Sequence, residues 1–231
     1  MLARRHTLVR YDGRGCGLSD RVDLQFSLDK AVEDLDAVIE AAQVRKFVLL
    51  GISSGAAIAM TYAIRHPKRI NHLVLYGAYT RGRMARSTTP EQREDAETQI
   101  KAIQVGWGQE NPAFRQLYTS LWMPDATMEQ ARAFNELIRQ STTPANATKL
   151  MEMAFGLDLR NTATRIRCPT HVLHVRDSAV APFEEGRMLA GLISGARFVP
   201  FESRNHLLLE SEPAFLQLAQ EIEALLADAG P

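Results

Sequence analysis

The sequence predicts an α/β fold built on a mostly parallel sheet. Short β-branched or apolar runs alternate with stretches of helical periodicity, which is typical of parallel strands joined by crossover helices. Of the 231 residues, 45% are apolar and 23% are charged, which is the composition of an ordinary globular protein. A chain of this length can bury a sizeable core.

The expected elements follow one another along the chain. Apolar and β-branched runs predict strands at residues 6–12, 47–50, 71–77, 170–175 and 196–200. Apolar positions spaced three and four apart predict helices at residues 27–43, 56–66 and 212–227, the first with Ser27 as its N-cap. Because this alternation occupies both ends of the chain, residues 1–78 and 165–231 are assigned to one α/β core.

Residues 79–164 break the alternation. They contain helical patterns, starting near Pro90, near Thr127 and at 146–155, and no convincing strand. We interpret them as a helical lid inserted over the carboxyl edge of the sheet. Its large apolar side chains form either the lid's own core or a surface that binds a hydrophobic substrate. The candidates for substrate binding are Trp107, Phe114, Trp122 and Met123.

A G-x-S-x-G pentapeptide at residues 51–55 lies between a predicted strand and a predicted helix. The sharp turn between them is expected to force the central serine into a strained conformation and to present its hydroxyl at the edge of the sheet. Glycines at 51 and 55 are expected because a side chain there would collide with the neighbouring strand or helix. Ser53 is the candidate nucleophile, since Ser54 does not have glycine at both minus two and plus two.

A serine nucleophile needs a base and a third group that orients the base. Asp177 follows the strand at 170–175 and His206 follows the strand at 196–200, so both are expected at the same sheet edge as Ser53. Glu202, four residues before His206, is the alternative carboxylate. Taken singly, Asp177 could be a turn residue and His206 a loop histidine.

Longer motifs resemble the α/β-hydrolase superfamily over nearly the whole chain. They are the D-x-R-G-x-G-x-S loop at residues 12–19, His-Pro-Lys-Arg-Ile at 66–70, and the segment 206–213. Further motifs at 106–108, 111–115 and 202–206 resemble serine hydrolase domains found alone or fused to bacterial transcriptional regulators or cyclases.

This resemblance implies a role for each candidate residue. Ser53 would be the nucleophile, His206 the general base and then acid, and Asp177 the orienting carboxylate. The backbone N–H of Ser54 would supply one donor of the oxyanion hole.

The resemblance also implies strands that this sequence lacks. Residues 6–12 would correspond to the family's fourth strand, and the oxyanion loop after the third strand would be missing. Loss of one oxyanion donor typically lowers kcat by about 10²–10³. Three explanations stay open: a truncated product of a longer gene, direct pairing of strand 6–12 with the strand before Ser53, or a homodimer formed through the exposed sheet edge.

Charge and composition argue against several classes of function. Lys and Arg total 27 and Asp and Glu total 27, so no basic footprint for nucleic acid is present. No apolar run approaches the roughly 18 residues of a membrane span. Cys16 and Cys168 fit no disulfide or zinc pattern, and the glycines at 13, 15 and 17 do not fit the dinucleotide motif. We therefore expect no metal, no cofactor, no nucleic-acid or membrane partner, and a reduced cytoplasmic location.

The sequence thus predicts an α/β-hydrolase fold that lacks the usual first strands and carries a helical lid. The predicted activity is hydrolysis of a small ester through a Ser-His-Asp triad and an acyl-enzyme. The alternative is a ligand-sensing or interaction domain that keeps the fold and turns over little. A DNA-binding regulator is disfavoured, because the chain has no helix-turn-helix pattern and its net charge is zero.

Overall fold

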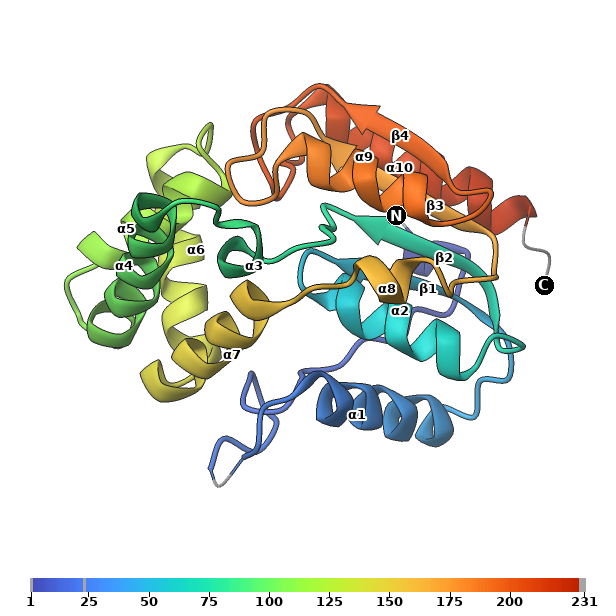
Figure 1. Cartoon of the computed structure of the whole chain (residues 1–231), viewed down its shortest axis with the longest axis horizontal. Coiled ribbons are helices and arrows are strands. Elements are labelled where there is room, and N and C mark those ends of the chain that lie inside the picture. The colour runs from blue at the N-terminus through green and yellow to red at the C-terminus, as the bar shows by residue number, and fades with distance from the viewer. Residues whose placement is uncertain (1, 23, 229–231) are drawn as a thin grey trace.

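The computed structural model describes residues 2–22 and 24–228 and has an α/β architecture (Figure 1). In these residues one sheet contains four parallel strands in the order β1-β2-β3-β4. The strands are β1 (Phe47–Ile52), β2 (Ile70–Tyr76), β3 (Thr170–Val175) and β4 (Arg197–Phe201). The four later predicted strands are therefore confirmed, with ends that differ from the prediction by at most two residues.

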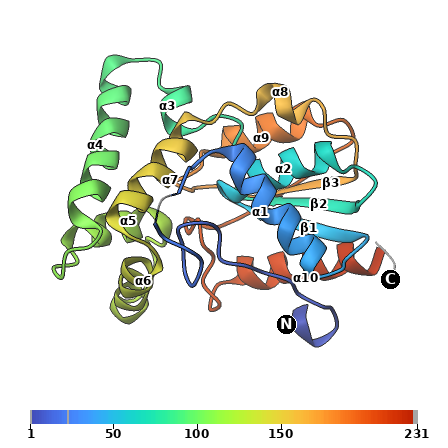
Figure 2. The same cartoon turned by 90° about the horizontal axis from the view of Figure 1, so that it is seen from below.

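Helices cover the two faces of this sheet unequally (Figure 2). One face carries α1 (Leu28–Ala41), α2 (Gly55–Arg65), α8 (Arg160–Ala163) and α9 (Phe183–Leu192). The other face carries α10 (Pro213–Asp228), which packs on the β3 and β4 side. The predicted helices at 27–43, 56–66 and 212–227 are confirmed, and Ser27 accepts a hydrogen bond from the Lys30 N–H at 3.2 Å as the N-cap of α1.

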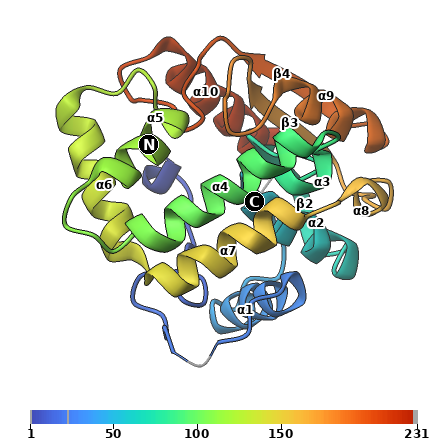
Figure 3. The same cartoon turned by 60° about the vertical axis from the view of Figure 1, so that its left-hand side comes forward.

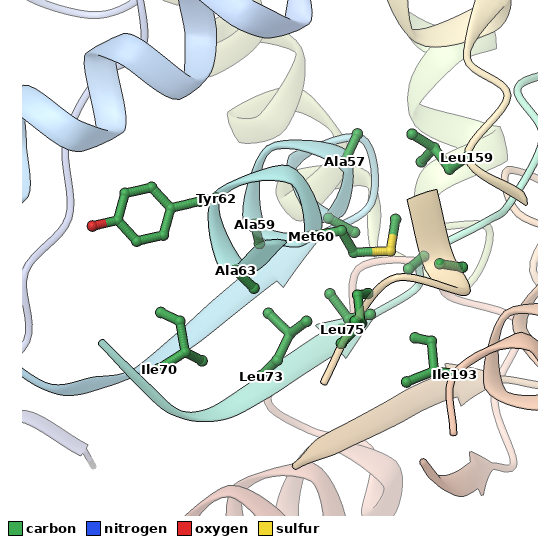
Figure 4. Packing of buried hydrophobic residues seen from close by; sticks show 14 of the residues in the cluster. Ala57, Ala59, Met60, Tyr62, Ala63, Ile70, Leu73, Leu75, Leu159 and Ile193 are labelled. Carbon is green, nitrogen blue, oxygen red and sulfur yellow. The ribbon is translucent and has the colours of Figure 1, made fainter. Parts of the chain in front are cut away.

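The larger core lies between α2 and β2 (Figure 4). Met60 and Tyr62 from α2 and Leu73 and Leu75 from β2 are all 0% exposed. Successive side chains of a strand point to opposite faces, so Val74 packs in the second cluster with α10. Full burial of a large apolar side chain contributes about 1.5–3 kcal/mol. This packing holds α2 firmly against the sheet.

β1 is an edge strand that pairs, among the described strands, with β2 alone. The strand predicted at residues 6–12 is wrong: residues 7–13 have no regular secondary structure, and Leu8 is 54% exposed. Direct pairing of that segment with β1 is wrong for the same reason. A segment with strand-like composition becomes a strand only where another strand accepts and donates its backbone hydrogen bonds. Pairing of two chains along the β1 edge stays a prediction.

The glycine-rich loop after residue 12 instead docks on the helical insertion. Gly15 and Gly17 have φ of 77° and 55°, and the Asp12 carboxylate accepts a hydrogen bond from the Leu18 N–H at 3.0 Å. The Gly17 N–H donates to the Ser141 carbonyl at 2.7 Å. This contact places the loop next to the insertion rather than in the sheet.

The insertion between β2 and β3 consists of helices packed beside one another (Figure 3). They are α3 (Arg83–Arg86), α4 (Pro90–Gly106), α5 (Ala113–Trp122), α6 (Met128–Ser141) and α7 (Pro144–Gly156). Thr89 and Thr127 cap the N-termini of α4 and α6 with their side chains, and these two helices begin where the sequence predicts. No helix in the described part of the chain is long and apolar enough to cross a membrane.

The two glycines that flank Ser53 have different surroundings. A Cβ added at Gly51 would lie 2.7 Å from Ala56 Cα and 2.8 Å from Ala59 Cβ, because α2 passes directly over the end of β1. At Gly55 a Cβ would meet nothing within 4 Å. The expected collision is therefore confirmed at Gly51 and wrong at Gly55.

This difference yields a matched pair of stability predictions. Gly51→Ala should lower the free energy of unfolding by about 1–3 kcal/mol, because the added methyl group overpacks the contact with α2. Gly55→Ala, in the first turn of α2, should leave it unchanged or raise it by up to about 1 kcal/mol, because the unfolded chain loses freedom. Urea denaturation of both variants measures the free energy of unfolding. If both variants lost the same amount of it, the packing described here would be contradicted.

Candidate functional site

Ser53 has the strained backbone geometry that the sequence predicts for it. Its φ is 52°, in the left-handed region where a non-glycine residue is strained by about 1–3 kcal/mol. The Ser53 N–H donates to the Tyr76 carbonyl at 2.8 Å, and the Ser53 carbonyl accepts from the Ala56 N–H at 3.1 Å. These two bonds fix the strand-to-helix turn at the carboxyl end of β1.

A cavity of about 260 Å³ opens at this turn, between the sheet edge and the helical insertion. Ser53, Ser54 and Cys16 lie in its wall, together with apolar side chains of the insertion. The candidate binding residues Trp107, Phe114 and Trp122 also line it. Drug-sized ligands occupy pockets of about 300–1,000 Å³, so this cavity fits a smaller, mainly apolar molecule.

Met123 is not among the residues that line the cavity, which corrects the prediction for this side chain. It is the C-cap of α5, with φ of −141°, so the chain leaves the helix at this residue. Trp122, one position earlier, still lies on the helix and reaches the cavity. Sequence spacing alone does not locate that end of the helix.

The wall of the cavity also contains two arginines, Arg83 and Arg86. Arg83 forms an ion pair with Asp95. Arg86 donates to the carbonyls of Arg81 at 3.2 Å and Val180 at 3.3 Å, and burial lowers its pKa. The wall of the cavity thus combines apolar side chains with two arginines, one of which is paired with a carboxylate.

His206 lies in the loop between β4 and α10 and is completely buried. Its carbonyl accepts a hydrogen bond from the Tyr76 hydroxyl at 2.9 Å. The Glu212 carboxylate holds the same loop by accepting from Ser203 Oγ at 2.6 Å and from Asn205 Nδ2 at 3.1 Å. The imidazole is thereby fixed in the protein interior.

Several contacts place His206 beside the serine turn. Gly77 directly follows Tyr76, whose carbonyl binds the Ser53 N–H, and a Cβ at Gly77 would lie 2.7 Å from His206 Cε1. The Trp122 ring, which lines the same cavity as Ser53, stands edge-on to the imidazole with ring centroids 5.0 Å apart. His206 Nε2 has no hydrogen-bond partner among the described residues. The structure thus brings Ser53 and His206 to one sheet edge.

The structure does not bring Asp177 to His206. Asp177 is exposed, and its backbone N–H donates to the Ser203 carbonyl at 3.1 Å. The group beside His206 Nδ1 is instead the hydroxyl of Ser178, at 3.0 Å. This finding corrects the assignment of Asp177 as the orienting group.

The alternative carboxylate is also directed away from the imidazole. The Glu202 side chain is 78% exposed and forms an ion pair with Arg176 at 2.8 Å. Sequence reasoning missed Ser178 because it searched for a carboxylate. Only the path of the loop after β3 shows that Ser178, and not the neighbouring Asp177, faces inward.

Burial keeps the imidazole neutral. It lowers the pKa of His206 from its ordinary 6.5 to about 4, and the neighbouring His174 lowers this pKa further in the same direction. Burial likewise lowers the pKa of His174, whose Nε2 lies 2.9 Å from the Ala181 carbonyl. A neutral imidazole is the form that can accept a proton near pH 7.

This lowered pKa predicts a loss of stability in acid. Between about pH 6.5 and pH 4 the unfolded chain binds a proton at His206 and the folded protein does not, so the free energy of unfolding falls as pH falls. Over this pH range the proton uptake at His206 lowers the free energy of unfolding by about 3 kcal/mol in full. Urea denaturation at pH 7 and pH 4.5 should show a smaller drop for His206→Gln than for the wild type. The partly exposed His6→Gln serves as the control, and an unchanged drop in His206→Gln would contradict the prediction.

Comparisons with known proteins agree with this fold. Residues 1–213 match the family model described as the alpha/beta hydrolase fold. The AB hydrolase superfamily protein YisY of Bacillus subtilis is 26% identical over 228 residues, which span 97% of this chain and 81% of the relative. A putative carbamate hydrolase, RutD of Klebsiella pneumoniae, is 25% identical over 214 residues, spanning 89% of this chain and 76% of that protein.

Solved structures give the same result at the level of the fold. An esterase from Exiguobacterium antarcticum has a TM-score of 0.76 at 21% identity, covering 95% of this chain and 80% of that one. A hydrolase from Oleispira antarctica has a TM-score of 0.79 at 18% identity, covering 92% and 78%. Since the family model spans most of the chain, the protein belongs to the alpha/beta hydrolase fold family.

Proposed function

We propose that this protein is a serine hydrolase that cleaves small carboxylic esters through an acyl-enzyme. The observation that carries the proposal is Ser53, held at a φ of 52° in the wall of a cavity, with the buried His206 at the same sheet edge and in contact with Trp122 of that wall. A strained serine between a strand and a helix is the arrangement that exposes a nucleophilic hydroxyl. The relatives named as a putative carbamate hydrolase and an esterase support attack on a carbonyl group.

In the proposed reaction Ser53 Oγ attacks the ester carbonyl and its proton passes to His206 Nε2. The Ser54 N–H, at the start of α2, stabilises the oxyanion that forms. His206 then returns the proton to the leaving alcohol, and water releases the acyl group in a second, equivalent round. The orienting role proposed for Asp177 is not retained, because Ser178 occupies the position beside Nδ1.

A second candidate is a ligand-sensing domain with little turnover. Two observations favour it: a hydroxyl stands where an orienting carboxylate is expected, and His206 Nε2 has no hydrogen-bond partner among the described residues. The cavity could then hold a small apolar ligand without cleaving it. The two candidates differ in whether Ser53 forms a covalent bond.

A fluorophosphonate probe distinguishes the candidates. The wild type should be labelled and should hydrolyse p-nitrophenyl acetate, whereas Ser53→Ala should lose the label and about 10²-fold or more in rate. Ser54→Ala is the matched control, because it keeps the backbone N–H and the nucleophile, so it should remain labelled. An unlabelled wild type that hydrolyses the ester no faster than Ser53→Ala would reject the enzyme and leave the ligand-sensing domain.

The size of the cavity predicts a preference for short acyl groups. The wild type should cleave p-nitrophenyl acetate and butyrate with higher kcat/KM than the decanoate, because about 260 Å³ is a small volume. Phe114→Ala removes a ring from the wall and should shift the optimum towards longer chains. Met128→Ala, at a side chain that is 68% exposed and outside the wall, should leave the preference unchanged. If Phe114→Ala does not change the preference for acyl chain length, the acyl group does not bind in this cavity.

A further inference from the structure

Ser178 makes three polar contacts at one oxygen atom. Its Oγ lies 3.0 Å from His206 Nδ1. The backbone N–H groups of Val180 and Ala181 both donate to the same oxygen, at 3.3 Å and 3.2 Å. The side chain is buried, with 7% of the residue exposed.

The number of hydrogen atoms and lone pairs decides the direction of the bond to His206. A hydroxyl has one hydrogen to donate and two lone pairs that accept. The N–H groups of Val180 and Ala181 occupy both lone pairs, so the hydroxyl hydrogen is left to donate to His206 Nδ1. Nδ1 is therefore the acceptor, and the single ring proton of a neutral imidazole resides on Nε2.

This tautomer is unsuited to the proton transfer that a serine nucleophile needs. A general base takes the serine proton on the lone pair of Nε2, while Nδ1–H donates to a group that can only accept. With the proton already on Nε2, that lone pair is absent. Before the Ser53 proton can transfer, the ring must lose a proton at Nε2 and gain one at Nδ1, and the Ser178 hydroxyl must break its bonds and turn.

We propose that Ser178 is a positioning residue that holds His206 in the Nε2–H tautomer and thereby keeps Ser53 weakly activated. This inference rests on the proposed function of Ser53 and His206. It also identifies the place of Ser178 as a ready site for a carboxylate, because two N–H groups already point at it.

A carboxylate at this position would reverse the tautomer. It can only accept hydrogen bonds, so it would bind the Val180 and Ala181 N–H groups and require His206 to present Nδ1–H. Nε2 would then offer its lone pair to the Ser53 hydroxyl. Asp177 and Glu202 are exposed and do not bond to the imidazole, and His174 is the titratable neighbour that acts on His206.

The test compares Ser178→Asp with Ser178→Asn. The two side chains have the same size and shape, but the amide accepts from the two N–H groups with its oxygen and donates to Nδ1 with its nitrogen, which preserves the wild-type tautomer. Ser178→Asp should raise kcat for p-nitrophenyl acetate by about 10²–10⁴-fold. It should also move the acidic limb of the pH–rate profile to higher pH, because a carboxylate favours the imidazolium. Ser178→Asn should do neither.

A second measurement does not depend on activity. Nitrogen-15 NMR of the imidazole, with the signals of His206 assigned by their loss in His206→Gln, reports which ring nitrogen carries the proton. The proton should be on Nε2 in the wild type and in Ser178→Asn, and on Nδ1 in Ser178→Asp. The wild-type spectrum decides the tautomer even if Ser178→Asp does not fold.

The possible results separate this inference from the ester proposal. A wild-type proton on Nδ1, or an equal rate gain in Ser178→Asn and Ser178→Asp, would overturn the role of Ser178 and leave Ser53 as a nucleophile. If the tautomers are as described and no variant hydrolyses an ester or reacts with the fluorophosphonate, the positioning role stands and the ester proposal fails.

Discussion

The close approach of α2 to the end of β1 is the constraint on which the site depends. Gly51 has no Cβ, which lets Ala56 and Ala59 pass within contact distance, and the chain must then turn at Ser53 with a φ of 52°. A strain of about 1–3 kcal/mol at this residue is balanced by the buried side chains of α2, such as Met60 and Tyr62, which pack on β2. The position of the Ser53 hydroxyl in the cavity wall and that of the Ser54 N–H both follow from this turn.

The environment of the imidazole is built jointly by the sheet and by the helical insertion. The Trp122 carbonyl accepts the Leu207 N–H at 3.2 Å, and Asn205 Oδ1 accepts the Asp125 N–H at 3.0 Å. These bonds join the end of α5 to the loop that carries His206. A displacement of the insertion would therefore change the shape of the cavity and the burial of the imidazole together.

Asp177 and Ser178, which follow β3, point in opposite directions and differ in their hydrogen-bonding chemistry. Asp177 faces solvent, whereas Ser178 turns inward to His206 and to two backbone N–H groups. A carboxylate accepts hydrogen bonds only, while a hydroxyl accepts and donates. The inward residue thus sets where the proton of a buried, neutral imidazole resides, and the protonation state of the site depends on the path of a few loop residues.

Local chemistry along the chain was sufficient to predict much of this protein. Some elements depend only on residues that lie close together in the sequence, so their patterns predict them well. These are strand 170–175, the helices capped by Ser27 and Thr127, and the turn at Ser53.

Other features depend on contacts between distant parts of the chain. Residues 6–12 have the composition of a strand and do not form one, because strand formation needs a partner strand that composition does not supply. The exclusion of Met123 from the cavity and the inward position of Ser178 depend on where a helix ends and how a loop packs against residues far along the chain. Those long-range contacts exist only once the chain has folded, and they decided which group stands beside the His206 imidazole.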